Sequence, residues 1–254
     1  MILTRLGNKR AIANKIIPHF PKHTTYIEPF FGAGGLFFYK PLAKYNIVND
    51  LDSDVFNLYM VVLNQKEELL SELARMPAHQ DLIKYWKKNQ ETNPVLKAVR
   101  FLLLSNFTFL GTGDTLRICN SSNKKTIIEN RIDETQNMLK NVMFSNNDAC
   151  DFLMSISFME KNNSFIYLDP PYIDTRDNYS HSFTKQDSIR IFDCLDNLGV
   201  RFAMSEFNND FIIEQANDRG LNVIEIGERK SLKNRSVEIL VTNYDKANDL
   251  FNYL

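Results

Sequence analysis

The sequence predicts an α/β protein in which a mostly helical insert interrupts the alternation of strands and helices. At both ends of the chain, short apolar runs rich in β-branched and aromatic residues alternate with amphipathic helical patterns, an order typical of strand–helix–strand units. In the middle, apolar residues recur almost entirely at helical spacing. We therefore predict an α/β domain formed by residues 1–55 and 142–254 and an inserted domain formed by residues 56–141.

The elements before the insert follow from local patterns. A loop leads into an amphipathic helix that Pro18 and Pro21 end, because proline cannot continue a helix. A glycine-rich turn then separates a short strand from a helix, and Ser53 is a candidate N-cap of a long helix. In chain order, we expect a helix within residues 6–21, a strand at 24–30, the glycine turn at 31–35, a helix starting in 36–42, a strand at 45–50 and a helix at 53–76.

The insert and the second half of the α/β domain are predicted in the same way. Helical patterns in the insert are broken near Pro94 and by a polar stretch, residues 112–125, that contains one possible hairpin strand. Strands and helices alternate again after the insert. We expect insert helices within 80–111 and 127–142, strands at 142–146, 165–169, 200–206, 222–228 and 237–244, and helices at 149–156, 186–199 and 210–220.

The composition is that of an ordinary globular protein. The chain is 44% hydrophobic and 24% charged with a net charge of −1, so no overall basic field points to nucleic acid. Its three cysteines are too few and too widely spaced to indicate a disulfide framework or a zinc site. The N-terminal stretch lacks the apolar core of a signal peptide, and no apolar run reaches the roughly 18 residues of a membrane helix. We therefore expect a cytoplasmic protein with no metal site and no membrane contact.

The glycine turn and the acid after the next strand indicate a ligand site. Gly32, Gly34 and Gly35 lie between a strand and a helix, where glycine lets the backbone turn tightly and approach a ligand closely. The third glycine of the dinucleotide-binding pattern is missing. Asp50 ends the second strand, and an acid at that place in doubly wound folds accepts hydrogen bonds from ribose hydroxyls. Alone, this pattern is equally consistent with an ordinary strand–turn–helix junction.

A second unusual stretch, Asp169-Pro170-Pro171-Tyr172, ends a run of apolar residues that we predict to be a buried strand. Proline cannot continue a central strand, because it lacks a backbone N–H group. With this stretch and the glycine turn in the same chain, the sequence resembles the Dam-type DNA adenine methyltransferases, the alpha-order group of amino-methyltransferases.

The resemblance covers both ends of the chain, and its segments occur in the family's order. The stretch DPPY corresponds to the family's catalytic motif, and NRSVEILVTNY resembles its closing segment. The resemblance implies a Rossmann-like, S-adenosylmethionine-dependent methyltransferase fold with a mostly helical inserted target-recognition domain. It also implies cofactor-binding residues, which are Lys9 in LGNK, Phe30, Gly32 and Gly34 in PFFGAG, Asp50 in NDLDSDVFNLY and Asp148 in NNDACDFL.

The chemistry that the resemblance implies is methyl transfer from S-adenosylmethionine to N6 of an adenine flipped out of double-stranded DNA. Asp169 and the carbonyl of Pro170 would accept hydrogen bonds from the adenine amino group, Pro171 would keep the corner rigid, and Tyr172 would stack on the base. The glycine turn would pass under the methionine part of the cofactor. Asp50 would hold the ribose, Asp148 the cofactor adenine and Lys9 the carboxylate.

Basic clusters are candidates for the DNA-binding surface, although charge runs are usually solvated faces. RKSLKNR is the most promising, because it contains no acid and its flanks are predicted strands; NSSNKK and KYWKK are further clusters. Arg117 and Asn120 are candidate base readers, since arginine commonly pairs with guanine and asparagine with adenine. The residues predicted to meet phosphate are Lys124, Lys125, Arg229, Lys230, Lys233 and Arg235.

Other functions remain open at this point. Transfer to cytosine N4 is the nearest alternative, but those enzymes favour serine where this chain has Asp169. A non-catalytic DNA-binding relative is the alternative from another class, and the intact DPPY argues against it. The insert lacks the family's usual Asn-Gly-Leu stretch, so only the resemblance suggests GATC as the target. We expect a monomer, and a cognate restriction endonuclease is a candidate partner.

Overall fold

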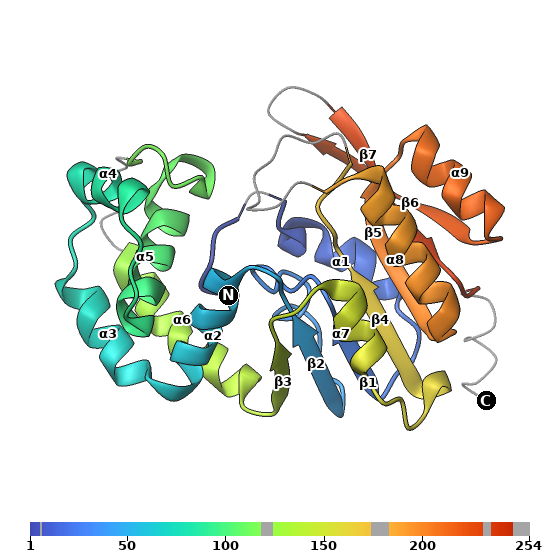
Figure 1. Ribbon diagram of the computed structural model, residues 1–254, viewed down its shortest axis with the longest axis horizontal. Coiled ribbons are helices and arrows are strands. Elements are labelled where there is room, and N and C mark those ends of the chain that lie inside the picture. The colour runs from blue at the N-terminus through green and yellow to red at the C-terminus, as the bar shows by residue number, and fades with distance from the viewer. Residues whose placement is uncertain (6, 118–123, 174–182, 231–234, 246–254) are drawn as a thin grey trace. The chain divides into compact units, whose positions relative to one another are not determined.

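The computed structural model describes residues 1–5, 7–117, 124–173, 183–230 and 235–245, and the chain folds into two compact units (Figure 1). The sheet unit consists of Ala11–Phe31, Leu42–Leu51 and Met143–Leu254. The helical unit consists of Met1–Arg10, Gly32–Pro41 and Asp52–Val142. The helical unit thus contains the whole of the predicted insert, together with residues 1–10, 32–41, 52–55 and 142, which sequence analysis had placed in the α/β domain.

The sheet unit contains a seven-stranded sheet with the strand order β3-β2-β1-β4-β5-β7-β6. β2, β4 and β5 continue the parallel sheet around β1, whereas β7 runs antiparallel to both β5 and β6. The prediction of an α/β methyltransferase-like fold is confirmed. The strands are β1 (Thr25–Glu28), β2 (Tyr45–Asn49), β3 (Val142–Ser145), β4 (Ser164–Leu168), β5 (Arg201–Phe207), β6 (Asn222–Lys230) and β7 (Arg235–Thr242).

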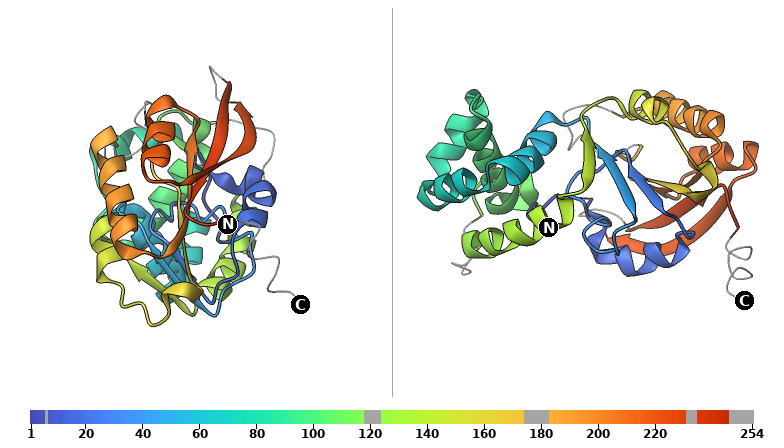
Figure 2. Two further views of the ribbon diagram at one scale, coloured as in Figure 1. Left: turned by 90° about the vertical axis from the view of Figure 1, so that its right-hand side faces the viewer. Right: turned by 90° about the horizontal axis from the view of Figure 1, so that it is seen from below.

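Successive side chains of the central strands point to opposite faces of the sheet. On one face, Tyr26 of β1 and Phe165 and Tyr167 of β4 form an aromatic cluster with Phe20 from the N-terminal segment. This segment contains η1 (Lys9–Ile12), α1 (Ala13–Ile16) and η2 (Ile17–His19). Within the sheet unit, the blue N-terminal helix and the yellow and orange helices lie on opposite sides of the strands (Figure 2). We call the face with the tyrosines the aromatic face.

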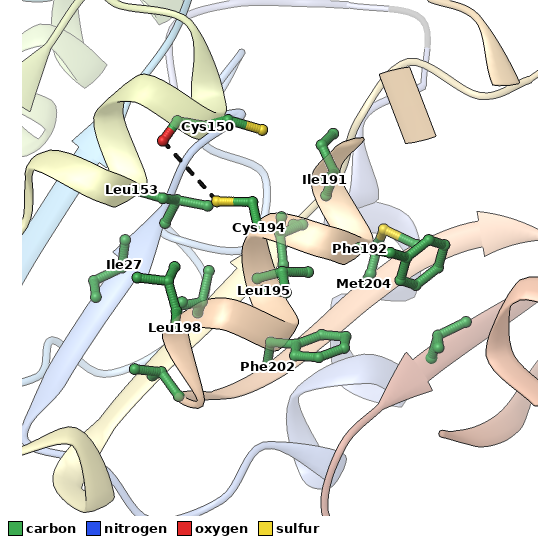
Figure 3. Close-up of a cluster of buried hydrophobic side chains, with 14 of the residues drawn as sticks. Ile27, Cys150, Leu153, Ile191, Phe192, Cys194, Leu195, Leu198, Phe202 and Met204 are labelled. Atoms are coloured by element: carbon green, nitrogen blue, oxygen red, sulfur yellow. Dashed lines mark hydrogen bonds between the residues drawn. The ribbon is translucent and has the colours of Figure 1, made fainter. Parts of the chain in front are cut away.

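The other face is covered by α7 (Ala149–Ser155), α8 (Lys185–Leu198) and α9 (Asp210–Asp218). Ile27 of β1 packs there with apolar side chains of α7 and α8 (Figure 3). Ile166 of β4 belongs to the same cluster of buried side chains. Cys194 of α8 directs its thiol toward the carbonyl of Cys150 of α7, 4.0 Å away (Figure 3). A sheet covered on both faces explains why the central strands are almost continuously apolar in sequence.

The helical unit contains α2 (Ser53–Asn64), α3 (Lys66–Arg75), α4 (Gln80–Lys88), α5 (Pro94–Phe107), η3 (Phe109–Gly111) and α6 (Lys124–Leu139). The predicted break near Pro94 is confirmed, because Pro94 occupies the first turn of α5 and Asn93 caps it. The single helix predicted at 53–76 is wrong, since the chain breaks at Gln65 into α2 and α3. The hairpin strand predicted at 112–125 is reduced, in the described part of that stretch, to one bridge between Thr108 and Leu116.

The helix predicted to start within residues 36–42 is also wrong. This segment forms turns, in which Phe38 N–H donates to Gly34 O and Lys40 N–H donates to Leu36 O, each at 3.0 Å. Proline at 41 lacks the N–H group that a continuing helix would need and disfavours helical geometry at the residue before it. The segment therefore stops after little more than one turn.

Candidate functional site

The carboxyl ends of three neighbouring parallel strands bring together residues that are far apart in the sequence. Glu28 of β1 pairs with Val48 of β2, and Ile27 pairs with Ile166 of β4. Counting on from these pairs puts Phe30, Asp50 and Asp169 at about the same level beyond the ends of β1, β2 and β4. In open α/β sheets, ligands bind outside the carboxyl ends of the strands. The sheet unit thus brings its predicted cofactor and catalytic residues to one edge.

Asn49, the last residue of β2, ties the loops at this edge together. Its side-chain amide donates to Pro29 O at 3.1 Å and to Asn147 O at 3.0 Å, and its Oδ1 accepts from Asn147 N–H at 3.0 Å. Its own carbonyl accepts from Phe31 N–H at 2.9 Å. Sequence analysis did not single out Asn49, although a buried asparagine at a strand end was a signal for such a role.

The backbone of Asp50 is fixed by the segment that follows β3. Asn146 Nδ2 donates to Asp50 O at 2.6 Å and to Leu51 O at 3.1 Å, while Asp50 N–H donates to Ser145 O at 3.3 Å. These bonds hold the main chain on both sides of the Asp50 side chain, which is half-buried. The main chain that carries the carboxylate is thus fixed, and the contact of Asp50 with the cofactor ribose stays a prediction.

The glycine turn of the helical unit packs closely against the segment that carries Lys9. A Cβ atom at Gly35 would lie 2.2 Å from Asn8 Oδ1 and 3.1 Å from Lys9 N, so any other residue at position 35 would force these neighbours to move. Gly32 and Gly34 have φ values of 51° and 66°, a left-handed conformation that favours glycine. A Cβ at Gly32 would have no atom within 4 Å, so the backbone at Gly32 borders open space that a ligand can approach.

Lys9 is almost completely buried, and its ammonium donates to Gly7 O at 3.4 Å. A buried lysine is rare unless it meets negative or polar groups, so a solvated surface charge, the ordinary role of a lysine, is excluded. Sequence analysis had named Gly34 and Lys9 separately. Gly35, which allows the two segments to pack together, was named as part of the glycine turn but not among the predicted cofactor-binding residues.

Asp148 has a structural role in addition to its predicted one. It caps α7 by accepting from Cys150 N–H at 3.0 Å and Asp151 N–H at 3.2 Å, and its other oxygen accepts from Arg190 Nη2 at 2.5 Å. Burial alone would raise the pKa of this carboxyl, but the hydrogen bonds from Arg190 and the two amides outweigh burial and lower the pKa. Asp148 is therefore ionised at neutral pH, and its contact with the cofactor adenine stays a prediction.

The Asp169–Tyr172 corner directly follows β4, in which every residue is buried. Asp169 is half-buried, and Pro170 is buried. Tyr172 is also buried, its hydroxyl donates to Glu238 Oε1, and its ring meets that of Phe207 edge to face. Burial raises the pKa of Tyr172 far above its usual value, and the negative charges of Asp169 and Glu238 raise it further. The phenol therefore stays protonated and donates its hydrogen bond to Glu238, and the stacking of the Tyr172 ring on the target base stays a prediction.

The helical unit holds three of the predicted DNA-binding residues within the described part of the chain. Arg117 is exposed, and its main-chain N–H donates to Phe107 O at 2.7 Å. Lys124 donates to Asn106 O at 2.8 Å and lies over the Phe107 ring, 5.6 Å from its centroid. Lys125 donates to Ala74 O at 3.3 Å, at the end of α3. The two lysines thus bind main-chain carbonyls, and their contact with phosphate stays a prediction.

The remaining predicted DNA contacts belong to regions that the structure describes in part or not at all. Asn120 and Lys233 lie outside the described residues. Arg229 and Lys230 are in β6 and Arg235 is in β7, where Lys230 pairs with Arg235. The two strands confirm the prediction that strands flank the RKSLKNR segment, and the contact of this segment with DNA stays a prediction.

Among the residues that the structure describes, no group of three or more histidine, cysteine, aspartate or glutamate side chains is arranged to hold a metal ion. In the same part of the chain, no helix combines the length and the apolar character needed to cross a bilayer.

Comparison with known proteins identifies the family. The model of the D12 class N6 adenine-specific DNA methyltransferases matches residues 6–232. The chain is 26% identical to the type II methyltransferase M1.LlaDCHI of Lactococcus lactis, covering 94% of this chain and 93% of the relative. It is 25% identical to the type II methyltransferase M.MjaIII of Methanocaldococcus jannaschii, covering 94% and 96%. It is 30% identical to the DNA adenine methylase of Escherichia coli K12 over 41% of this chain and 40% of that protein.

The predictions of an adenine-modifying enzyme and of its methyl donor are confirmed by this match. Transfer to cytosine N4, the nearest alternative, does not agree with a family model that is specific for adenine N6. The chain belongs to the D12 class of N6-adenine-specific DNA methyltransferases, enzymes that transfer a methyl group from S-adenosylmethionine to adenine N6 in DNA.

Proposed function

We propose that the Asp169–Tyr172 corner is the place where the target adenine is methylated. The observation that carries this proposal is that Asp169 directly follows β4, at the edge where Phe30 and Asp50 follow the neighbouring strands. An exocyclic amino nitrogen is a poor nucleophile, because its lone pair is delocalised into the ring. Asp169 and the carbonyl of Pro170 would each accept one of its N–H groups and so favour a localised lone pair.

The cofactor supplies a methyl group already activated as a sulfonium, so the protein has to provide position and electrostatics. In the sheet unit, Asp50 would accept from ribose hydroxyls and Asp148 from the cofactor adenine. In the helical unit, the open space beside Gly32 fits the close approach of the methionine part, and Lys9 would pair with its carboxylate. Within each unit, the residues present therefore fit the part of S-adenosylmethionine that is assigned to them.

The target base must leave the duplex to reach a corner at a sheet edge, which requires base flipping. The ring of Tyr172 would stack on the flipped base, and its hydroxyl would not compete for the base because it is bonded to Glu238. After transfer, the nitrogen carries an extra acidic proton, which Asp169 would accept. No strong base is needed beforehand.

We also propose that residues 56–141 recognise the target sequence in double-stranded DNA. Support comes from the prediction that the α/β domain supplies both cofactor binding and chemistry, and from the exposed Arg117 in the helical unit. The names of two relatives, both type II methyltransferases, support a role beside a cognate restriction endonuclease. Because its substrate is DNA, we expect the enzyme to act in the cytoplasm, and we expect it to act as a monomer.

The proposal is tested by Asp169→Ala, with Asp218→Ala as the control. Asp218 is an exposed aspartate at the end of α9, so its replacement changes the net charge equally. Transfer of tritiated methyl groups to DNA should be lost in Asp169→Ala and kept in Asp218→Ala, while both variants keep the wild-type affinity for the cofactor and the wild-type melting temperature. Transfer by Asp169→Ala at near the wild-type rate would show that the chemistry takes place elsewhere.

A further inference from the structure

Tyr172 contacts two residues from strands that follow it in the sequence. Its hydroxyl donates to Glu238 Oε1, and its ring lies 4.6 Å from the Phe207 ring, centroid to centroid, at an interplanar angle of 82°. Phe207 of β5 and Glu238 of β7 are directly opposite each other in the antiparallel register. Tyr172 therefore contacts both members of one cross-strand pair. We call this pair, Phe207 and Glu238, the tyrosine seat.

The seat lies on the aromatic face of the sheet. Ser205, two residues before Phe207, bonds through its hydroxyl to Tyr167 at 2.8 Å on that face. Glu238 alternates with Val237 and Ile239, which pack into the core on the other face. The seat is thus part of the rigid sheet and not of a surface loop, and a group attached to it is held with little freedom.

The side chain of Glu238 is only 1% exposed, so its carboxylate has lost nearly all contact with water. Burying a carboxylate is costly unless hydrogen bonds or opposite charges compensate for lost water. The phenol of Tyr172 supplies one such bond. Across the next strand, Glu238 is opposite Gly227, where the ammonium of Lys15 lies 3.1 Å from the position that a Cβ atom would take. The ammonium of Lys15 therefore lies beside the residue that pairs with Glu238 in the neighbouring strand.

The hydrogen bond and the ring contact restrain different motions of Tyr172. The hydroxyl bond holds the far end of the side chain, while the edge-to-face contact with Phe207 limits rotation of the ring. A ring that stacks on a base must present one plane, and two restraints fix that plane better than one. Because burial keeps the pKa of Tyr172 high, the donor proton is present across the working pH range.

We propose that Glu238, together with Phe207, is a positioning residue that fixes the Tyr172 ring for stacking on the target adenine. The proposal rests on the assignment of the Asp169–Tyr172 corner to methyl transfer. Glu238 acts through Tyr172 and touches neither substrate nor cofactor in this scheme. Its loss should therefore lower kcat and leave the KM for S-adenosylmethionine unchanged.

The test compares Glu238→Leu, Glu238→Gln, Tyr172→Phe and the double variant Glu238→Leu/Tyr172→Phe. Tyr167→Phe is the matched control, because it also removes a buried phenol hydroxyl bonded between neighbouring strands. Steady-state methylation of a DNA duplex gives kcat and both KM values, and thermal unfolding shows that each variant is folded.

We expect Glu238→Leu and Tyr172→Phe each to lower kcat by about 5- to 100-fold, the range that loss of positioning produces. Glu238→Gln should recover most of the activity, since its amide oxygen still accepts the phenol hydrogen bond. The double variant should be no worse than the poorer single variant, because both changes remove the same bond. Tyr167→Phe should keep the wild-type kcat.

The outcomes separate this inference from the proposed function. If Asp169→Ala is inactive while Tyr172→Phe and a folded Glu238→Leu keep the wild-type kcat, the tyrosine seat has no role in catalysis. Multiplicative losses in the double variant would also contradict the inference, since Glu238 would then act independently of Tyr172. If Asp169→Ala is active, the proposed function itself fails. Should Glu238→Leu not fold, Tyr172→Phe, which removes one oxygen atom, still decides the matter.

Discussion

Replacing Gly35 by alanine perturbs the contact between the glycine turn and the segment that carries Lys9. The added Cβ atom would lie 2.2 Å from Asn8 Oδ1, and 3.1 and 3.2 Å from the main-chain nitrogens of Lys9 and Arg10. The nearest atom belongs to a side chain and can rotate away. The two nitrogens belong to the main chain and must shift by a few tenths of an ångström.

The cost of Gly35→Ala follows from these contacts. Rotation of Asn8 would break the bond in which Asn8 Oδ1 accepts from Arg10 N–H at 2.9 Å, at a cost of about 1 kcal/mol. The main-chain shift adds the cost of overpacking, which is about 1–3 kcal/mol in well-packed sites. We therefore expect a loss of about 2–4 kcal/mol in the free energy of unfolding, from these two contributions together.

Urea unfolding measures this loss, and the background variant Asn8→Ala makes the test specific. Removing Asn8 Oδ1 takes away the nearest obstacle, so Gly35→Ala should cost less in Asn8→Ala than in the wild type. Calorimetry should show weaker S-adenosylmethionine binding by Gly35→Ala, because the main chain at Lys9 is displaced. Equal costs in both backgrounds, or no cost in either, would refute the argument that close packing at Gly35 shapes this segment.

Three further predictions concern the cofactor, pH and DNA. Asp50→Ala should weaken S-adenosylmethionine binding by about 1.5–3 kcal/mol in calorimetry, and an unchanged affinity would remove Asp50 from the site. Because the folded pKa of Asp148 is lowered, Asp148 stabilises the fold above about pH 4, its unfolded pKa, and this stabilisation is lost as pH falls through the folded pKa. The wild type should thus exceed Asp148→Asn in unfolding free energy at pH 7, and the difference should shrink at acid pH; a constant difference contradicts this. Arg117→Ala should weaken the binding free energy for the cognate duplex by about 1–3 kcal/mol and that for a scrambled duplex only little. Equal losses of binding free energy on both duplexes would instead identify Arg117 as a phosphate contact.

The sheet was predictable because its signals are local. Strand β4 is a short apolar run that ends just before Asp169 and two prolines, and β2 ends on Asn49, just before Asp50. Each strand and its end could therefore be found from neighbouring residues. The alternation of strands with helices then predicts a parallel sheet. The residues at its carboxyl edge follow from the topology, without knowledge of any side-chain contact.

The features that sequence analysis missed depend on contacts between distant residues. The bond from Tyr172 to Glu238 joins residues 66 positions apart, and Asn49 bonds to Asn147 across 98 positions. Nothing in the local pattern of NRSVEILVTNY connects its glutamate with the DPPY stretch. The break at Gln65 was missed for a different reason, since the apolar spacing of α2 and α3 is continuous through it.

The central claim is that this chain methylates adenine N6 through Asp169, and one measurement tests it most directly. Long-read sequencing of DNA from a methylation-free host, expressing either the wild type or Asp169→Ala, reports the modified atom and its sequence context together. We predict N6-methyladenine at one short sequence throughout the genome with the wild type, and unmodified DNA with Asp169→Ala at equal protein levels. Methylation of cytosine by the wild type, or adenine methylation that persists in Asp169→Ala, would contradict the account.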